Sequence, residues 1–305
     1  MSARPHLARL IARARKYAPL PMAIVYPCDR DALLAAAEAA RAQLITPLLV
    51  GPRDRILASA EAAGVDIAAF ALHDIGGEPA AAARAAVALC HDGRARAMMK
   101  GSLHTDELMG AAVASKGGLR GARRISHVFV IDVPGHPRPL LIADAVINIT
   151  PNLAAKRDIV QNAVDFAHAI GIDLPKVAIL SAVESVNPAI AGTVDAQALC
   201  EMARTGEISG AIVDGPFAMD NAISAEAARI KGIHSEVAGQ PDILLVPGLE
   251  AGNILYKALV YLARGECAGL VLGAKVPIVL TSRADSIQSR VASCALALLL
   301  KEQTR

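Results

Sequence analysis

The sequence contains no tryptophan, and aromatic residues of all kinds make up only 3% of its 305 positions. A core must therefore be built from alanine, valine, leucine and isoleucine, which suit the short buried strands of α/β proteins. Hydrophobic residues account for 54% of the chain and charged residues for 20%. This composition supports a large core and argues against disorder, and the length is sufficient for two domains.

Cysteine is scarce and dispersed. The five cysteines, Cys28, Cys90, Cys200, Cys267 and Cys294, are odd in number and form no CxxC pair. They indicate neither a disulfide framework nor a zinc site, and reduced thiols are typical of the cytoplasm. We therefore expect a cytoplasmic protein.

Neither sign of charge dominates, and long apolar runs are lacking. The 31 lysines and arginines are balanced by 29 acidic residues, a formal net charge of +2. This excludes the one-sided basic surface of a nucleic-acid-binding protein, and we expect no nucleic-acid partner. No segment is long and apolar enough to span a membrane. Residues 1–17 alternate basic and apolar side chains, which predicts a packed amphipathic helix and no secretory signal.

The sequence does contain a regular alternation of aliphatic strands and alanine-rich helices. This alternation predicts an α/β protein with parallel βαβ units, helices on both faces of a sheet, and ligands at the carboxyl ends of strands. The predicted strands of this type cover residues 22–26, 47–50, 97–99, 177–180, 211–213, 243–246 and 277–280.

A different pattern begins after residue 122. Two apolar runs, 128–133 and 140–142, flank a turn rich in proline and glycine, which predicts a β-hairpin. Thr150 and Pro151 then predict the start of a long helix. The change from alternation to hairpin places a domain boundary near residue 122.

Common catalytic motifs are absent. The chain has no P-loop, no GxGxxG, no HExxH and no GxSxG motif, and its eight histidines show no grouping typical of a metal site. We predict no metal site. The chemistry must therefore be carried by residues at strand ends.

The most informative strand end is followed by Ser282, Arg283, Asp285 and Ser286, just before a predicted helix. Hydroxyl donors, a guanidinium group and free N–H groups at a helix start can together hold a phosphate or a developing oxyanion. The alternative is that Asp285 or Ser286 only caps the helix.

Two further strand ends carry groups that suit an anion. Lys100, Gly101 and Ser102 form a strand-to-helix turn, although the glycine can equally serve only the turn. Asp214 can act as a base, orient a partner, or simply complete an Asp-Gly turn.

The segment 250–257 carries a third group of candidates. Asn253 offers an amide and Lys257 a flexible cation. An ordinary helix start with an extended surface lysine remains the alternative.

Three segments, 280–286 (LTSRADS), 213–224 and 246–257, resemble the phosphate acetyltransferase and phosphate butyryltransferase family. The LTSRxDS form is more similar to the butyryl branch. Supporting segments occur in colinear order and extend the resemblance to nearly all of residues 22–300: 99–106, 125–134, 142–164 and 237–245.

The resemblance implies a two-domain, three-layer α/β/α fold similar to that of isocitrate and isopropylmalate dehydrogenases, with the active site in the interdomain cleft. Residues 1–122 and 273–305 would form one domain, and 123–272 the other. It also implies a homodimer or larger homo-oligomer, no metal or permanently bound cofactor, and coenzyme A as a substrate.

The implied reaction is reversible transfer of a short acyl group, acetyl or butyryl, between coenzyme A and inorganic phosphate. The coenzyme A thiolate attacks a bound acyl phosphate in a ternary complex. By position, Ser282 and Arg283 match the family pair that polarises the carbonyl and holds phosphate. The acetyl branch has an aspartate where this chain has Ser289, so Asp285 is the candidate base.

Gly110 stands where the family has a substrate-binding arginine. This difference implies a roomier acyl pocket, compensation by Arg120 or Lys100, or weakened activity. The candidates for substrate binding are Lys100, Gly101, Ser102, Asp214, Asn253, Lys257 and Ser286.

Two other functions remain open from the sequence. One is a metal- and nicotinamide-dependent hydroxyacid dehydrogenase of the same fold, although Asp214 and Asp220 have no convincing third ligand. The other is a non-catalytic subunit that binds acyl-coenzyme A, which Gly110 keeps in consideration.

Overall fold

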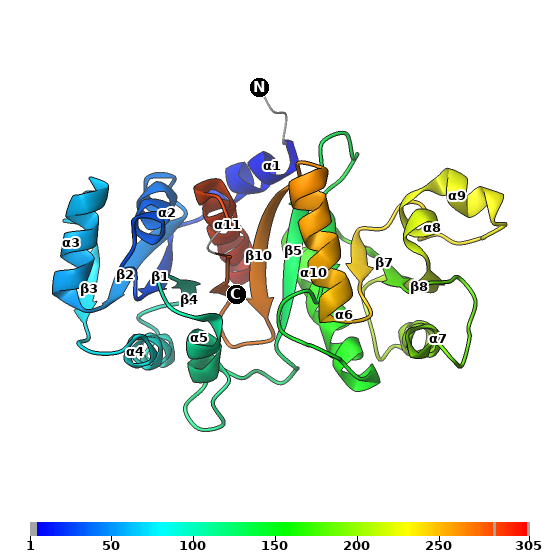
Figure 1. Cartoon of the computed structure of the whole chain (residues 1–305), viewed down its shortest axis with the longest axis horizontal. Helices are drawn as coiled ribbons and strands as arrows, with labels where there is room; N and C mark the ends of the chain where they lie inside the picture. The colour runs from blue at the N-terminus through cyan, green and yellow to red at the C-terminus, as the bar shows by residue number, and fades with distance from the viewer. Residues whose placement is uncertain (1–4, 283–284, 304–305) are drawn as a thin grey trace. The chain divides into compact units, whose positions relative to one another are not determined.

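The structure is a computed structural model that describes residues 5–282 and 285–303 (Figure 1). Contacts within the chain divide it into two compact units. Unit 1 comprises Met1–His6 and Arg124–Cys267, and unit 2 comprises Leu7–Arg123 and Ala268–Arg305. Both are built from strands and helices, which confirms the α/β class. The predicted domains, 1–122 with 273–305 and 123–272, stay a proposal.

Unit 2 contains a sheet in the order β3-β2-β1-β4-β11-β10. Strands β1 to β4 and β11 run parallel to one another, as the βα alternation predicted. The strands are β1 (Leu20–Val25), β2 (Ile45–Gly51), β3 (Ala71–Asp74), β4 (Ala97–Lys100), β10 (Glu266–Leu272) and β11 (Ile278–Val279).

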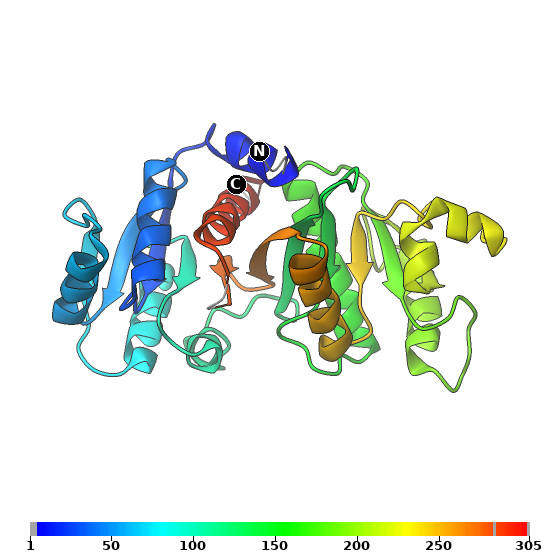
Figure 2. The ribbon, with the colours of Figure 1, turned by 45° about the horizontal axis from the view of Figure 1, so that its top comes forward.

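Helices cover both faces of this sheet. In the two ribbon views, α4 and α5 lie on one side, and α2 and α11 lie together on the other (Figures 1 and 2). Alanines and leucines fill the layer between helices and strands, in keeping with the lack of aromatics. The helices assigned to this unit are α1 (Pro5–Ala14), α2 (Arg30–Arg41), α3 (Arg53–Ala63), α4 (Pro79–His91), α5 (Thr105–Ala112) and α11 (Ile287–Gln303).

One strand of unit 2 departs from the parallel pattern. β10 pairs with β11 in antiparallel fashion, with Val271 opposite Ile278. The connection between them, residues 273–277, is too short for the crossover that a parallel pair requires. Gly273, at φ 80°, provides the left-handed conformation of this turn.

Unit 1 contains a sheet in the order β5-β6-β9-β7-β8. Its strands are β5 (Ser126–Asp132), β6 (Leu140–Ala143), β7 (Lys176–Leu180), β8 (Ile212–Phe217) and β9 (Ile243–Leu245). Its helices are α6 (Leu153–Ala169), α7 (Ala191–Thr205), α8 (Met219–Ile223), α9 (Ala225–Ile230), α10 (Leu249–Lys257) and the π-helical turn η1 (Ala258–Leu262).

The core of unit 1 contains two of the few aromatic residues in direct contact. The rings of Phe129 on β5 and Tyr256 on α10 stack with their centroids 3.9 Å apart and their planes 4° from parallel. Aliphatic residues of β6, β7 and β9 surround them. This cluster fixes α10 to the sheet.

The predicted hairpin is confirmed. β5 and β6 pair antiparallel, with Val130 opposite Leu141. The start of the following helix was predicted two residues too early, because the capping residue is Asn152 and not Thr150. The Asn152 side chain accepts a hydrogen bond from the Ala155 amide at 2.9 Å. None of the helices in the described ranges is long and apolar enough to cross a membrane.

Candidate functional site

A cavity of about 520 Å³ lies at the carboxyl ends of β1 and β4 in unit 2. In the strand order β3-β2-β1-β4, successive strands are added on one side of β1 and then on the other. Open parallel sheets bind ligands at this reversal point. We refer to this cavity as the switch-point cavity; its lining residues are Asp29, Arg30, Asp31, Lys100, Gly101, Ser102 and Arg290.

The predicted turn after β4 forms one wall of the switch-point cavity. Lys100 is the last residue of β4 and is buried, with 6% of its surface exposed. Gly101 lies so close to β1 that an added Cβ would stand 2.4 Å from the Val25 carbonyl oxygen. The glycine therefore permits the two strand ends to approach each other. The Ser102 amide continues this contact by donating to the Tyr26 carbonyl at 2.8 Å.

The opposite wall is the start of α2. Asp29 caps this helix, because its Oδ1 accepts from the Ala32 amide at 2.7 Å. Its Oδ2 accepts from the Ser102 hydroxyl. Asp31 pairs with its neighbour Arg30, whose Nη1 lies 3.4 Å from the carboxylate. Both carboxylates at this wall thus have partners: Asp31 its neighbour Arg30, and Asp29 both its own helix start and Ser102 of the other wall.

The loop before α11 carries the catalytic candidates. Ser282 is exposed, and its amide donates to Asp285 Oδ2 at 2.6 Å. The Ser286 hydroxyl accepts from the Ser289 amide at 3.0 Å, which is the geometry of a helix cap. Arg283, the guanidinium expected to hold phosphate, lies outside the described residues. Asp285 therefore fixes a turn at the loop, whatever further role it has.

Arg290 is a residue of this site that the sequence analysis did not identify. It lies in α11, has 5% of its surface exposed, and lines the switch-point cavity. Its Nη2 donates to the Ser282 carbonyl at 3.3 Å, which connects the cavity to the catalytic loop. A signal was present in the sequence: Ser286, Ser289, Arg290 and Ser293 recur at helical spacing in an otherwise apolar helix.

The remaining candidates belong to unit 1. Asp214 lies in β8, and its Oδ1 accepts from the Gly215 amide at 2.8 Å, so this Asp-Gly pair is part of a strand and does not form the turn that was one alternative. Asn253 donates from Nδ2 to the Ala145 carbonyl at 3.4 Å, and Lys257 is exposed at the end of α10. Within the described part of unit 1, no hydrogen bond joins these three side chains to one another.

A sequence model of the family described as phosphate acetyl/butaryl transferase matches residues 79–298, which is most of the chain. The chain belongs to this family. It is therefore an enzyme, a phosphate acyltransferase that moves an acetyl or butyryl group between coenzyme A and phosphate.

Relatives within the family cover almost the whole chain. A phosphate acetyltransferase of Rhizobium meliloti is 56% identical over 97% of this chain and 94% of its own length. A phosphate butyryltransferase of Clostridium beijerinckii is 39% identical over 97% of this chain and 98% of its own length. Of these two, the acetyltransferase is the more similar, whereas residues 280–286 alone favoured the butyryl branch.

Solved structures agree with the fold. A branched-chain phosphotransacylase from Enterococcus faecalis V583 has a TM-score of 0.80 at 29% identity and covers 92% of this chain and 99% of its own. A 4-hydroxythreonine-4-phosphate dehydrogenase from Burkholderia phymatum has a TM-score of 0.57 at 13% identity, over 93% of this chain and 98% of its own. The second likeness concerns the fold alone, and it agrees with the dehydrogenase-like architecture implied by the sequence.

Gly110, where an arginine was expected in this acyltransferase family, lines a separate cavity of about 480 Å³. That cavity lies between α4 and α5, with Arg84, Asp106 and Lys116 among its lining residues. A Cβ built at Gly110 would meet no described heavy atom within 4 Å beyond its own helix and chain neighbours. The position therefore has room for a side chain and is not part of the wall of the switch-point cavity.

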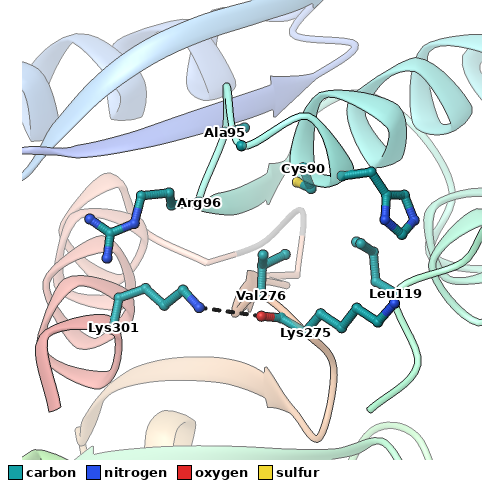
Figure 3. A pocket seen from close by; sticks show the side chains of 9 residues that line it. Cys90, Ala95, Arg96, Leu119, Lys275, Val276 and Lys301 are labelled. Carbon is teal, nitrogen blue, oxygen red and sulfur yellow. Dashed lines mark hydrogen bonds between the residues drawn. The ribbon is translucent and has the colours of Figure 1, made fainter. Parts of the chain in front are cut away.

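A third cavity, of about 320 Å³, lies in unit 2 at the amino ends of β4 and β11, the opposite ends of the strands from the switch-point cavity. Figure 3 shows Arg96, Lys275 and Lys301 around it, with Lys301 donating to the Lys275 carbonyl at 3.3 Å. Arg96 is paired with Glu302 at 3.9 Å. None of the residues predicted to carry the acyl transfer lines this cavity.

Four of the five cysteines of the acyltransferase are poor nucleophiles. Burial raises the pKa of the Cys28 thiol, with Arg55 opposing the shift, and raises that of Cys200 to about 11. Burial also raises the pKa of Cys90 and of Cys294 to about 12. These four thiols stay protonated at neutral pH, and only a thiolate attacks efficiently.

Proposed function

We propose that the chain transfers an acetyl group between coenzyme A and inorganic phosphate, and that the phosphoryl group of acetyl phosphate binds in the switch-point cavity. The observation that carries this proposal is the cavity itself: buried Lys100 and Arg290 line it at the reversal of strand order. The greater similarity to the acetyltransferase supports acetyl as the acyl group.

The proposed reaction joins the sulfur of coenzyme A to the acetyl carbon while the carbon–oxygen bond to phosphate breaks. Ser282 and Arg283 polarise the carbonyl and hold the departing phosphate, a contribution of about 3 kcal/mol for one such donor. Asp285 takes the thiol proton. Because a free thiol has a pKa of about 8.5, this proton removal accelerates attack by roughly a hundredfold.

The raised thiol pKa values support direct transfer rather than an acyl-cysteine intermediate. Lys100, Ser102 and Ser286 are proposed to bind the phosphate. Gly101 is proposed to contribute by allowing the ends of β1 and β4 to approach each other. Asp214, Asn253 and Lys257 of unit 1 remain proposed contacts for the substrates. A homodimer or larger homo-oligomer, the absence of a resident cofactor, and a cytoplasmic location likewise remain proposals.

The proposal is tested by mixing the purified protein with acetyl phosphate and coenzyme A and recording thioester formation. We expect acetyl-coenzyme A to form, and butyryl phosphate to react with a lower kcat/KM. A protein that forms no thioester from either acyl phosphate would contradict the function. A higher kcat/KM for butyryl phosphate would contradict only the choice of acyl group.

Arg283→Gln is the variant that examines the chemical step. The guanidinium is proposed to act on charge that develops in the transition state, so kcat should fall far more than KM rises. A near-wild-type kcat would remove Arg283 from the mechanism.

A further inference from the structure

Arg290 carries a buried positive charge in an apolar helix. Only 5% of its surface is exposed, and the buried residues that follow it in α11 are alanines and leucines with one cysteine and one serine, Ser293. Removing a cation from water is unfavourable unless an anion or several hydrogen bonds compensate. The hydrogen-bond and ion-pair partners of this guanidinium therefore indicate whether Arg290 has a structural role or binds an anion.

The hydrogen bonds that Arg290 makes do not compensate its buried charge. Its Nη2 donates to the Ser282 carbonyl at 3.3 Å, a long hydrogen bond to a neutral group. Its Nε is buried without a hydrogen-bond partner. Among the residues that the structure describes, no carboxylate lies within ion-pair distance of the guanidinium.

The acidic residues of the same cavity do not compensate this charge. Asp29 is engaged by the Ala32 amide and the Ser102 hydroxyl, and Asp31 by Arg30. Lys100, also buried, adds a second cation to the lining. The acidic groups of the cavity are thus bonded to other residues, and neither of them pairs with Arg290.

We propose that Arg290 is the buried receptor for the phosphoryl group, shared by acyl phosphate and inorganic phosphate, in the switch-point cavity. A guanidinium fork matches the geometry of phosphate oxygens, which a carbonyl cannot satisfy. The inference rests on the proposed function for the identity of the anion. The buried Nε of Arg290 that lacks a hydrogen-bond partner, and hence the place for an anion, does not depend on it.

The hydrogen bond from Arg290 to Ser282 gives Arg290 a second role. Because Nη2 holds the Ser282 carbonyl, the group that binds phosphate is joined to the loop that carries the catalytic candidates. A phosphoryl group bound at Arg290 is therefore placed next to Ser282. Arg290 both binds substrate and positions the loop.

The test compares Arg290→Met, which removes the charge at similar length, with Arg290→Lys, which keeps the charge and loses the fork. Arg41→Met, on the exposed face of α2 in the same unit, is the matched control. We expect Arg290→Met to raise the KM for acetyl phosphate by about ten- to a hundredfold. The KM for coenzyme A should stay within about twofold. The KM of Arg290→Lys for acetyl phosphate should lie between those of Arg290→Met and wild type.

A second measurement requires no catalysis. Inorganic phosphate should raise the Tm of the wild-type protein and of Arg41→Met, and should have little effect on Arg290→Met. Without phosphate, Arg290→Met should be at least as stable as wild type, because an uncompensated buried charge has been removed. An arginine with a purely structural role would give the opposite result, a lower Tm on substitution.

The outcomes separate the two proposals. An unchanged phosphate-induced rise in Tm in Arg290→Met, together with lower stability, would overturn the assignment of Arg290 while leaving acyl transfer intact. A change confined to the KM for coenzyme A would assign the cavity to the phosphates of that substrate and overturn the present assignment. If wild type formed no thioester but its phosphate-induced rise in Tm disappeared in Arg290→Met, the receptor would stand and the reaction would fail.

Discussion

Cys28 lies after β1 and directly before Asp29, which lines the switch-point cavity. This position raises the question of whether its thiol acts as a nucleophile. Burial keeps its thiol protonated by raising its pKa. Cys28→Ser should therefore retain kcat within about twofold, since a serine preserves the size of the side chain and no acyl-cysteine is formed. Loss of most of the turnover in steady-state assays, in a variant with unchanged Tm, would contradict direct transfer.

The two glycines of the β4–α5 region predict opposite effects of the same substitution. In Gly101→Ala the new Cβ would collide with the Val25 and Tyr26 carbonyl oxygens at 2.4 and 2.7 Å, so β1 and β4 must separate. We expect a loss of about 1–3 kcal/mol in the free energy of unfolding and a higher KM for acetyl phosphate. Denaturant unfolding and initial rates measure both.

Gly110→Ala is the matched control for Gly101→Ala. Its Cβ meets open space within α5, and alanine suits a helix interior better than glycine. The free energy of unfolding should rise by about 0.5–1 kcal/mol, with activity unchanged. A strong loss of activity here would place Gly110 in the site.

At this scale, composition and spacing identified the turn Lys100–Gly101–Ser102, because a cation and a hydroxyl at a strand end are visible in the sequence. Arg290 was not identified, because most helical arginines are solvated and its helical spacing with three serines does not by itself indicate burial. Asp285 and Ser286 were ambiguous between capping and catalysis. Their hydrogen bonds establish the local turn and cap and leave the catalytic role as a proposal.

Among the elements, α6 offers the clearest local test, because its start was predicted at the wrong residue. Asn152 caps the helix through the Ala155 amide, whereas Thr150 is exposed. Asn152→Ala should lower the free energy of unfolding by about 1 kcal/mol, and Thr150→Ala should change it little. Equal effects in urea unfolding would contradict the assignment of the cap.

The periodicity of apolar residues predicted whether a segment is a helix or a strand better than it predicted where the segment begins and ends. The βα alternation and the hairpin were predictable because each leaves a local pattern of apolar residues. The strand β10 went unidentified, although the apolar run from Ala268 to Leu272 lies between Gly265 and Gly273. Its antiparallel pairing with β11 depends on a short connection, which becomes informative only once both strands are known.

For the whole molecule, the fold class followed from composition and alternation, but the site did not. Lys100 and Arg290 lie far apart in the sequence, and they line one cavity only because the segment after Ala268 returns to the unit of the first strands. Pairing over such a distance leaves no local pattern in a single sequence. The resemblance to a known family supplied the expectation of that return.

The central claim is that a phosphoryl group binds in the switch-point cavity against the buried guanidinium of Arg290. It is tested most directly by an experimental structure of the protein with inorganic phosphate bound. The account predicts a phosphate oxygen within about 3 Å of Arg290 Nε, with Lys100 and Ser102 on the same anion. A phosphate bound elsewhere, with Arg290 paired to a carboxylate of the protein, would contradict it.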